Sequence, residues 1–435
     1  MMLRRAIKSA VLFSAMVFMA GCQDDEQLTL RLANWADHSE IKIVDAILKE
    51  FERRNPGVLV KQESYPNQYR EKLIASFAAG TAPDVFLFDS VDIPTFADRG
   101  LALDLKPYMA RVGFNPDDYF PNVLEIAMRN GKLYAFPKDF TPMVIFYNKD
   151  VLRKNGVPFP RSDWTWNDFV QACLALRKDF DDDGKLDQYG SFFLRQLYQY
   201  QPFLWNNGGD ILSPDGARAS GFLNSPETVE AFRFLIDWHN KWDFTGPLNI
   251  KRNPTHRDRN VFYLGKAGFL LNGHWWLPEV KRYVKKRDLE IGVVGLPRVP
   301  GKKYQNVMYE SGWAVSVATQ RRKHAVKLAA FMSGEFAQRL SARRGLAISA
   351  MKRVAEEIAE KDSTGLEKIF LEEVAFARQP WGAKIPDFST IDDLLKQVFD
   401  RTVWGDEKLE LVIDDVTRKI DALLRERRLQ ADLAH

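Results

Sequence analysis

Between residues 28 and 90 the hydrophobic pattern switches repeatedly between two periods, and this restricts the fold more than any other feature of the chain. Residues 28–33 alternate apolar and polar side chains, which is typical of a half-buried strand. The pattern then continues as helix, strand, helix and strand over residues 41–51, 58–63, 67–79 and 85–88. This order predicts a doubly wound α/β unit around a parallel sheet.

The ends of the predicted strands carry polar and aromatic side chains. Ligands of open α/β sheets bind outside the carboxyl ends of the strands. In this chain those ends hold Asn34 and Trp35, then Tyr65, and then Asp89 and Ser90. We therefore expect these five residues to line a ligand site.

The amino-terminal segment indicates export. A basic patch over residues 4–8 precedes an apolar run over 10–20 that is too short to span a membrane. Small residues before Cys22 resemble a bacterial lipobox, although a Met stands where Leu is usual. We expect residues 1–21 to be removed as a signal peptide, Cys22 to carry the lipid, and residues 22–27 to form a tether. The protein would then be attached to a membrane in the periplasm or at the cell surface.

Cysteine count, length and charge limit the remaining classes. With Cys22 lipidated, Cys173 has no partner among the two cysteines, so the fold is held by its core without disulfides. A chain of 435 residues exceeds one compact domain and predicts two lobes. The net charge of +4 falls close to zero once the basic signal is removed, which argues against a nucleic-acid partner.

Further segments have clear local signatures. Residues 134–150 look extended, contain two prolines and then enter a helix, which suits a segment that crosses between lobes. Thr165 is placed to cap a helix over 166–178. Other helices are expected over residues 226–241, 366–376 and 406–425.

Five segments, in order, resemble the maltose-binding-protein-like family of extracellular solute-binding proteins. They are 81–90 (TAPDVFLFDS), 131–150 (GKLYAFPKDFTPMVIFYNKD), 165–169 (TWNDF), 266–278 (KAGFLLNGHWWLP) and 309–315 (YESGWAV). The resemblance covers essentially the whole chain after the signal. It implies an α/β periplasmic-binding-protein fold of type II, in which two doubly wound lobes enclose a ligand cleft.

The resemblance also implies a division of the chain and a function. The first lobe is expected from residues 28–140 and 305–350, and the second from 141–304 and 351–435. Family members mostly bind mono- or oligosaccharides, and some bind sugar phosphates or other solutes. We expect a monomer that captures a carbohydrate by lobe closure and delivers it to the permease subunits of an ABC importer.

A sugar site combines aromatic rings with planar polar groups. Sugar C–H faces stack on indoles, while the hydroxyls need carboxylate or amide partners. Tryptophans in predicted loops are the aromatic candidates: Trp35, Trp205, Trp275, Trp276, Trp313 and Trp381. The carboxylate candidates are Asp89, Asp139 and Glu310. For any single Trp, packing in the core is the commoner role.

The adjacent pair Trp275 and Trp276 allows a sharper hypothesis. A short apolar strand over 269–271 ends in a turn at Asn272 and Gly273. If the chain stays extended, two neighbouring indoles point in opposite directions. We expect one of them to stack on a sugar ring, opposite Trp35, Asp89 and Glu310, and the other to pack beneath it.

An acidic loop over residues 179–190 resembles an EF-hand calcium loop. Oxygen donors stand at the expected positions, with a Gly at the sixth: Asp179, Asp181, Asp183, Asp187 and the carbonyl of Lys185. Gly190 replaces the bidentate Glu of that motif. A structural calcium ion and a solvated acidic turn that binds nothing are equal alternatives, and no cofactor is required for function.

Two other function classes stay open. The sequence has no HExxH or GxSxG motif, and its histidines lack metal-ligand spacing. Asp89, Asp139 and Glu310 could nevertheless converge as a glycosidase acid and base. A lipid-anchored carbohydrate-active enzyme and a chemoreceptor-facing sensor are therefore the alternatives to a transport protein.

Overall fold

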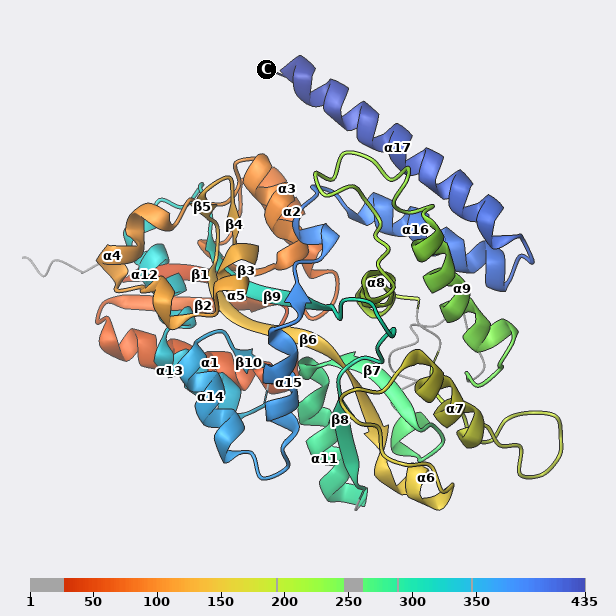
Figure 1. The fold of residues 1–435 in the computed structure, drawn as a ribbon. Coiled ribbons are helices and arrows are strands. Elements are labelled where there is room, and N and C mark those ends of the chain that lie inside the picture. Colours follow the sequence, from red (N-terminus) through yellow and green to blue (C-terminus); the bar gives the residue numbers. More distant parts are fainter. Residues whose placement is uncertain (1–26, 193–194, 246–260, 288, 346, 435) are drawn as a thin grey trace, which may run out of the picture.

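The computed structural model describes residues 27–192, 195–245, 261–287, 289–345 and 347–434. The signal peptide, Cys22 and nearly all of the tether lie outside these residues, so the expectations for them stay predictions. Within the described residues, none of the helices has the length and apolar character needed to cross a membrane. Figure 1 shows two α/β bodies joined by long strands, as the two-lobe expectation requires.

The first lobe contains the parallel sheet that the alternating pattern predicts. β1 (Leu28–Asn34) lies between β2 (Val58–Ser64) and β3 (Val85–Asp89) and is parallel to both. α1 (His38–Arg54) and α2 (Tyr69–Ala78) connect the three strands. All three carboxyl ends therefore lie along one edge of the sheet.

Two long strands lead from the first lobe into the second. β9 (Asn306–Val315) is antiparallel to β3, and β6 (Phe136–Asn148) is antiparallel to β9. Two short strands extend the pairing: β10 (Ile348–Ser349) on β6 and β11 (Ala377–Arg378) on β9. Among the described residues, the strand order is β10-β6-β9-β3-β1-β2. In Figure 1, β6 runs on into the second lobe, so both lobes share this strand.

In the second lobe the shared strand is flanked on both sides. β6 lies between β7 (Phe269–Gly273) and β8 (Ile291–Val294) and is antiparallel to both. α11 (Leu277–Arg287) joins β7 to β8, so these two strands run in the same direction. The three strands differ from a purely parallel sheet because β6 arrives from the first lobe and runs against its neighbours.

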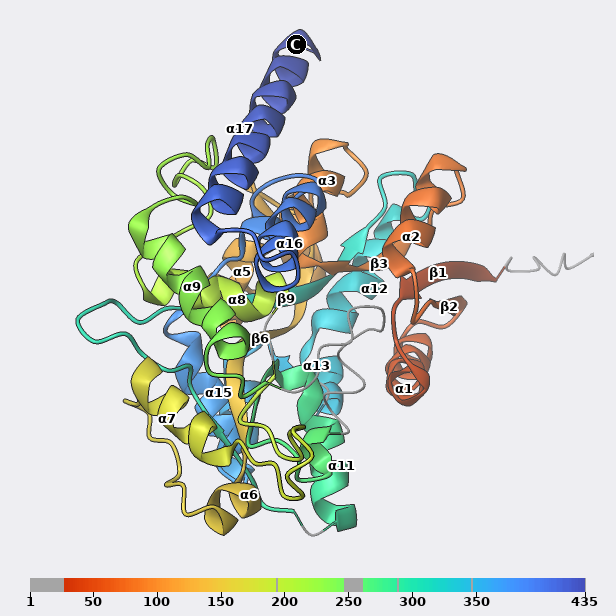
Figure 2. The same cartoon turned by 90° about the vertical axis from the view of Figure 1, so that its right-hand side faces the viewer.

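The remaining elements surround these strands. α7 (Trp166–Leu176) begins as predicted, because Thr165 and Asp168 cap it reciprocally. In the first lobe lie α3 (Ile93–Asp98), α4 (Met109–Val112), α5 (Pro121–Ile126), the β4–β5 hairpin (Met128–Arg129, Lys132–Leu133), α12 (Arg322–Ser333) and α13 (Glu335–Arg343). α14 (Lys352–Lys361) packs against both α13 and α15. In the second lie α6 (Lys149–Lys154), α8 (Leu197–Asn206), α9 (Pro226–Asn240), α15 (Leu366–Val374), α16 (Ser389–Val403) and α17 (Leu409–Ala434). Figure 2 shows the end of α17 projecting from the body.

Within the described residues, the buried apolar side chains form two hydrophobic cores. The first includes Leu32 and Phe86 of the parallel sheet, and it continues beneath β7 and β8 to Trp276. The second includes Phe169 and Trp238 and is closed by α16 and α17. Because the first core reaches into the second lobe, the cores do not delimit the lobes, and the lobe boundaries stay predictions.

Beyond the crossing strands, two short 3₁₀ helices bring the lobes together. η1 (Ser90–Asp92) follows β3, and η5 (Trp381–Ala383) carries Trp381, which packs in the second core. A Cβ atom at Gly382 would lie only 2.8 Å from Cγ1 of Val91. The approach of η5 to η1 therefore depends on the absence of a side chain at Gly382.

A polar contact lies beside this approach. The carboxylate of Asp387 accepts hydrogen bonds from Nη2 of Arg99 at 3.1 Å and from Oγ1 of Thr95 at 3.4 Å, both on or just after α3. Arg427 of α17 donates to the carbonyl of Asp387 at 3.0 Å. The segment after η5 is thus fixed to both lobes.

The close approach predicts the effect of adding one methyl group. Gly382→Ala should lower the free energy of unfolding by about 1–3 kcal/mol, because the new Cβ overlaps Val91 in a packed interface. Urea denaturation measures this loss. Adding Val91→Ala to the same chain should recover most of it, since the overlapping methyl is then absent. If the double variant is no more stable than Gly382→Ala, the approach of η1 to η5 is not what limits position 382.

Candidate functional site

A row of polar side chains crosses the sheet where the first lobe meets the second. Asp89 of β3 is paired with Ser311 of β9, and Ser311 is paired with Asp139 of β6. The hydroxyl of Ser311 donates to the carboxylate of Asp139, which also forms an ion pair with Lys138. Paired residues of neighbouring strands share a face, so these groups point to one side of the sheet.

The same face continues into the first lobe as a small cavity. Leu87 and Trp313, each two residues from the polar row, line it together with Trp35, Glu40 and Lys138. Its volume is about 20 Å³, which is room for a water molecule.

Beside this cavity, two buried groups have no hydrogen-bond partner in the part of the chain that the structure describes. They are Nδ2 of Asn34 and Nε1 of Trp313. The side-chain oxygen of Asn34 accepts from the backbone of Ala36 at 3.0 Å. This end of the face therefore offers unused hydrogen-bond donors.

Aromatic side chains of the second lobe lie at the other end of the face. Trp275 is 41% exposed, and its ring centroid lies 5.7 Å from that of Tyr198 on α8. Tyr198 in turn lies 6.4 Å from Tyr309, which is two residues from Ser311 on β9 and so shares its face. The face thus combines stacking surfaces with carboxylate and hydroxyl groups.

The chain separates the two adjacent indoles by a turn. Trp275 and Trp276 lie in the 3₁₀ helix η4 (His274–Trp276), and not in the extended conformation expected from the sequence. Trp276 is 1% exposed and packs on Phe146 and Tyr263, at centroid distances of 4.8 and 5.2 Å. Only Trp275 has ring surface left for a ligand. Stacking on a sugar stays a prediction.

The backbone before η4 determines where the indole of Trp275 can lie. A Cβ atom at Gly273 would come within 2.4 Å of Cζ3 and 2.7 Å of Cε3 of this indole. The ring therefore packs back over Gly273, and it occupies space that any other residue type at 273 would fill.

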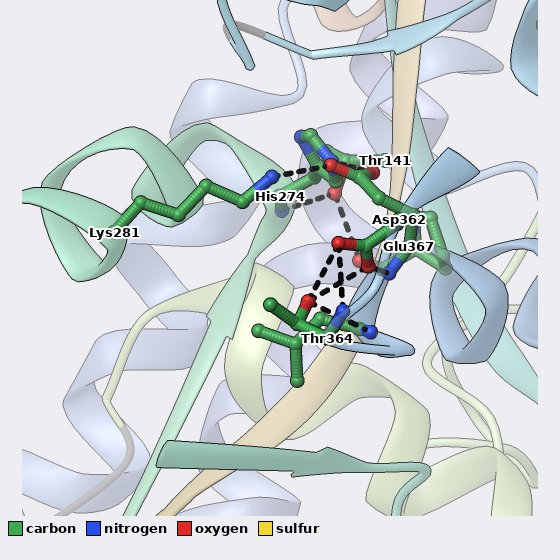
Figure 3. A network of polar contacts seen from close by, with 8 residues as sticks. Thr141, His274, Lys281, Asp362, Thr364 and Glu367 are labelled. Atoms are coloured by element: carbon green, nitrogen blue, oxygen red, sulfur yellow. Dashed lines mark hydrogen bonds and ion pairs between the residues drawn. The ribbon is translucent and has the colours of Figure 1, made fainter. Parts of the chain in front are cut away.

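A buried polar network holds the other side of η4 (Figure 3). The backbone N–H of His274 donates to Oγ1 of Thr141 on β6 at 2.7 Å, and its ring Nε2 lies 2.6 Å from Oε2 of Glu367 on α15. Lys281 of α11 donates to Oε1 of Glu367 at 2.9 Å, and the backbone N–H of Glu367 donates to Asp362 at 3.0 Å. Although burial opposes ionisation, the hydrogen bond from His274 and the charge of Lys281 lower the pKa of Glu367 to about 2.

Among the site carboxylates, Asp89 has a markedly perturbed pKa. Burial, and then the charge of neighbouring Asp92, raise the pKa of Asp89 to about 6. Its Oδ1 accepts from the backbone N–H of Val91 and from the hydroxyl of Ser90, both at 3.1 Å. Asp89 therefore changes charge close to neutral pH.

Glu310 lies apart from this group. Successive strand residues alternate faces, and Oε1 of Glu310 would lie 3.0 Å from a Cβ at Gly312, so its side chain is on the face opposite Ser311. Both of its carboxylate oxygens are buried, and none of the described residues forms a hydrogen bond with them. Burial, and then the charges of Asp139 and Asp89, raise its pKa well above the usual range. In this conformation Glu310 does not face Trp275, which corrects the arrangement expected from the sequence.

Two further tryptophans of the predicted set are buried around one carboxylate. Trp205 and Trp381 donate through Nε1 to Oδ1 of Asp210, at 2.8 and 2.5 Å. The guanidinium of Arg378 lies 4.0 Å from the ring of Trp205 and 3.0 Å from Oδ2 of Asp210. Their indole edges serve this cluster, and ligand contact by either ring stays a prediction.

Tyr65, also predicted as a site residue, is partly buried near the rim of the first lobe. Its hydroxyl donates to Glu63 at 3.4 Å, and the ammonium of Lys72 lies 4.8 Å from its ring centroid.

Of the site residues predicted from the sequence, the structure brings together Trp35, Asp89, Asp139 and Trp275 along one face.

Two cavities elsewhere contain none of the predicted site residues. The larger, of about 450 Å³, lies where α1, α12 and α13 meet, and its lining includes Arg54, Tyr119 and Phe336. A second, of about 380 Å³, is lined by residues that include Asp210 and Arg378. Size alone therefore does not locate the site, because the polar and aromatic face lies elsewhere.

Several residues of this face are not among those predicted from the sequence. Tyr198 and Tyr309 supply aromatic surface, Ser311 completes the polar row, and His274 and Thr141 hold η4. Tyr309 and Ser311 could have been found by following alternate residues along the second crossing strand. Tyr198 has no such signal, because α8 is buried on nearly all sides and lacks an amphipathic pattern.

The acidic loop brings three of its predicted ligands together. Oxygens of Asp179, Asp181 and Asp187 all lie within 4.8 Å of one another. Asp183 instead forms an ion pair with Lys185 at 3.2 Å. The residues present suit calcium, and binding stays a prediction.

Comparison with known proteins places the chain in context. The family model described as bacterial extracellular solute-binding protein matches residues 35–339. Among curated relatives, the maltodextrin-binding protein of Bacillus subtilis is 25% identical over 288 residues, covering 65% of this chain and 64% of that protein. The sn-glycerol-3-phosphate-binding periplasmic protein of Brucella abortus is 20% identical over 449 residues, covering 97% and 99%. The maltodextrin-binding match therefore spans less than two thirds of its relative.

Solved structures confirm the two-lobe fold. A substrate-binding protein of an ABC transporter from Listeria monocytogenes, in complex with cycloalternan, superimposes with a TM-score of 0.79 at 22% identity. The match covers 92% of this chain and 99% of that chain. The α/β architecture expected from the strand and helix pattern is therefore confirmed.

The pKa of Asp89 predicts a pH effect on stability. Because its pKa is raised from 3.8 to about 6, protonated Asp89 favours the fold, and this contribution is lost as the pH rises from about 4 through about 6. The melting temperature of the wild type, relative to Asp89→Asn, should therefore fall between about pH 4 and pH 7. Thermal unfolding at constant ionic strength measures it, with the exposed Asp393→Asn as control. Parallel profiles for wild type and Asp89→Asn would contradict the assignment.

The acidic loop predicts a response to calcium. If the loop binds calcium, a free calcium concentration of about 100 times the Kd should raise the free energy of unfolding by about 2.7 kcal/mol. Titration calorimetry and melting temperature measure the response, and Asp181→Asn should abolish it by removing one of the clustered ligands. The loop is a solvated turn if calorimetry shows no heat and chelator leaves the melting temperature unchanged.

Proposed function

Because the chain belongs to the bacterial extracellular solute-binding protein family, we propose that it captures a carbohydrate between its lobes and delivers it to the permease of an ABC importer. The observation that carries the proposal is the face shared by Trp275, Tyr198 and Tyr309 at one end and by Asp89 and Asp139 at the other. The sugar ligands named for the maltodextrin-binding relative and the cycloalternan complex support the same class of ligand.

The chemistry of this face suits a sugar ring. The exposed indole of Trp275 offers a flat apolar surface to the C–H face of a pyranose. Asp89 and Asp139 offer carboxylate oxygens to hydroxyl groups, and hydrogen bonds to charged groups contribute about 1.5–3 kcal/mol each. The aromatic end would set affinity, while the polar row would discriminate between hydroxyl configurations.

Capture requires that the ligand favour the closed arrangement of the lobes. A ligand shifts such an equilibrium only by the difference between its affinities for the two arrangements. Trp275 comes from the second lobe and Asp89 from the first, so a sugar that contacts both binds the closed form more tightly. Closure would then present the loaded protein to the permease.

The location follows from the family and from the amino-terminal sequence. Members of the family are extracellular, so the protein is exported. We further propose that Cys22 is lipidated and holds a monomer at the membrane, because small residues precede this cysteine after a short apolar run. Mass spectrometry of the purified mature protein would test the lipid at Cys22.

A second candidate ligand class comes from another relative. The Brucella abortus protein is named for sn-glycerol 3-phosphate and aligns with nearly the whole chain. Phosphate would lie close to Asp89 and Asp139, whose carboxylates disfavour an anion. We therefore place neutral sugars first, and the screen of ligands must include glycerol 3-phosphate.

Substitution of the two neighbouring tryptophans tests the proposal. Thermal shift against mono- and oligosaccharides should first identify a ligand, since binding to the native state raises the melting temperature. Trp275→Ala should then weaken binding by about 2 kcal/mol with little change in melting temperature. Trp276→Ala should instead cost about 3–5 kcal/mol of stability, because it empties a core position.

The matched pair supplies its own control. Calorimetry gives affinity, and urea denaturation gives stability for each variant. The stacking role fails if Trp275→Ala binds the sugar as tightly as the wild type. The carbohydrate function fails if glycerol 3-phosphate shifts the melting temperature and no sugar does.

A further inference from the structure

A buried pair of side chains, His274 and Glu367, lies directly beside Trp275 in the chain, because His274 precedes it in η4. His274 is 1% exposed and Glu367 is 6% exposed, and their side chains meet at 2.6 Å. We propose that this His274–Glu367 pair is a positioning device that orients the indole of Trp275 toward the ligand. The proposal rests on the function proposed above. It adds two residues, His274 and Glu367, which act on the ligand through Trp275.

Two anchors on one residue fix the orientation of η4. The backbone N–H of His274 is held by Thr141 of the crossing strand, and its ring is held by Glu367 of α15. Side chains in a 3₁₀ helix follow one another at about a third of a turn. Holding both the backbone and the ring of His274 therefore determines the direction in which Trp275 leaves the chain.

The acceptor of this hydrogen bond is itself held in place. Glu367 receives Lys281 on its other carboxylate oxygen, at 2.9 Å, while its backbone N–H is bound by Asp362. The hydroxyl of Thr364 also donates to Asp362, which closes the turn before α15 (Figure 3). The ring of Phe370, one turn further along α15, lies 4.8 Å from the imidazole. The imidazole of His274 is thus held by the hydrogen bond to Glu367 on one side and by packing against Phe370 on another.

The indole has a complementary restraint on its own side. It lies against the backbone of Gly273, where a Cβ would come within 2.4 Å, and its edge meets Tyr198. Gly273 and His274 therefore hold Trp275 from two directions, although its ring remains 41% exposed. An exposed aromatic ring held in one pose loses little conformational freedom when a ligand binds.

The chemistry of the pair favours an orienting role over simple packing. Replacing both partners of a buried hydrogen bond with apolar side chains of the same shape can leave stability nearly unchanged or higher. Among the described residues Nδ1 of His274 has no hydrogen-bond partner, although it is buried, and a buried polar atom without a partner costs stability. The hydrogen bond between Nε2 of His274 and Oε2 of Glu367, at 2.6 Å, is directional, whereas an apolar contact is not. It can therefore fix the orientation of the imidazole.

Fluorine NMR of protein labelled with 5-fluorotryptophan tests the proposal without any ligand. The resonance of Trp275 is assigned by its absence in Trp275→Phe. His274→Leu should shift and broaden this resonance, whereas His274→Gln, whose amide N–H can replace Nε2, should leave it near the wild-type position. The resonance of Trp404, in another part of the second lobe, serves as the control. An unchanged Trp275 resonance in His274→Leu overturns the proposal.

A second variant covers the case in which His274→Leu does not fold. Glu367→Ala removes the acceptor and leaves the sequence of η4 unchanged, and it should shift the same Trp275 resonance. If Glu367→Ala folds and leaves that resonance in place, the pair does not position the indole.

Ligand affinity gives an independent readout in a double-mutant cycle. For the sugar that most raises the melting temperature of the wild type, His274→Leu should weaken binding about tenfold when Trp275 is present and not at all in Trp275→Ala. Equal losses in both backgrounds overturn the proposal. If no sugar binds the wild type, the carbohydrate function fails, and the fluorine spectra still decide whether the pair positions Trp275.

Discussion

The antiparallel pairing of β6 with β9 is the interaction on which the rest of the structure depends. β9 pairs with β3 of the first lobe, and β6 continues between β7 and β8 of the second. The ladder therefore places Asp89, at the carboxyl end of β3, on the same face as Tyr309, which is linked to Trp275 through Tyr198. A change of register by one residue would turn Ser311 and Asp139 to the opposite face and remove the polar row.

The candidate site combines two kinds of support. Its carboxylates stand on strands that are paired on both sides, so their positions follow from the sheet. Two of its aromatic rings, Trp275 and Tyr198, stand on a 3₁₀ helix and on α8, where no ladder fixes them. The turn instead depends on Thr141, Glu367 and the bare backbone of Gly273. Specific side-chain contacts thus supply at η4 the rigidity that main-chain pairing supplies at Asp89.

Much of the fold, and part of the site, could be predicted from the sequence. Period changes marked β1 to β3, and the position after a strand identified Asp89, because both depend on local pattern. Glu310 could not be oriented, since the face of a strand residue depends on its register with partners far along the chain. Tyr198 could not be found, because α8 contains Pro202 and is buried on nearly all sides, which erases the helical period. The sequence predicts that one of Trp275 and Trp276 packs inward. It does not predict which one, because the inward position is determined by contacts with Phe146 and Tyr263.

The shared strand limits how the two lobes can move. A paired ladder cannot slide without breaking its hydrogen bonds together, and the first core continues under β7 and β8 without a gap at the crossing. Bending and twisting of β6 and β9 leave the hydrogen bonds of the ladder and the packing of the first core intact. The crossing should therefore deform elastically. Bending the two hydrogen-bonded strands takes up free energy when the lobes open, and this free energy is released when the lobes close again.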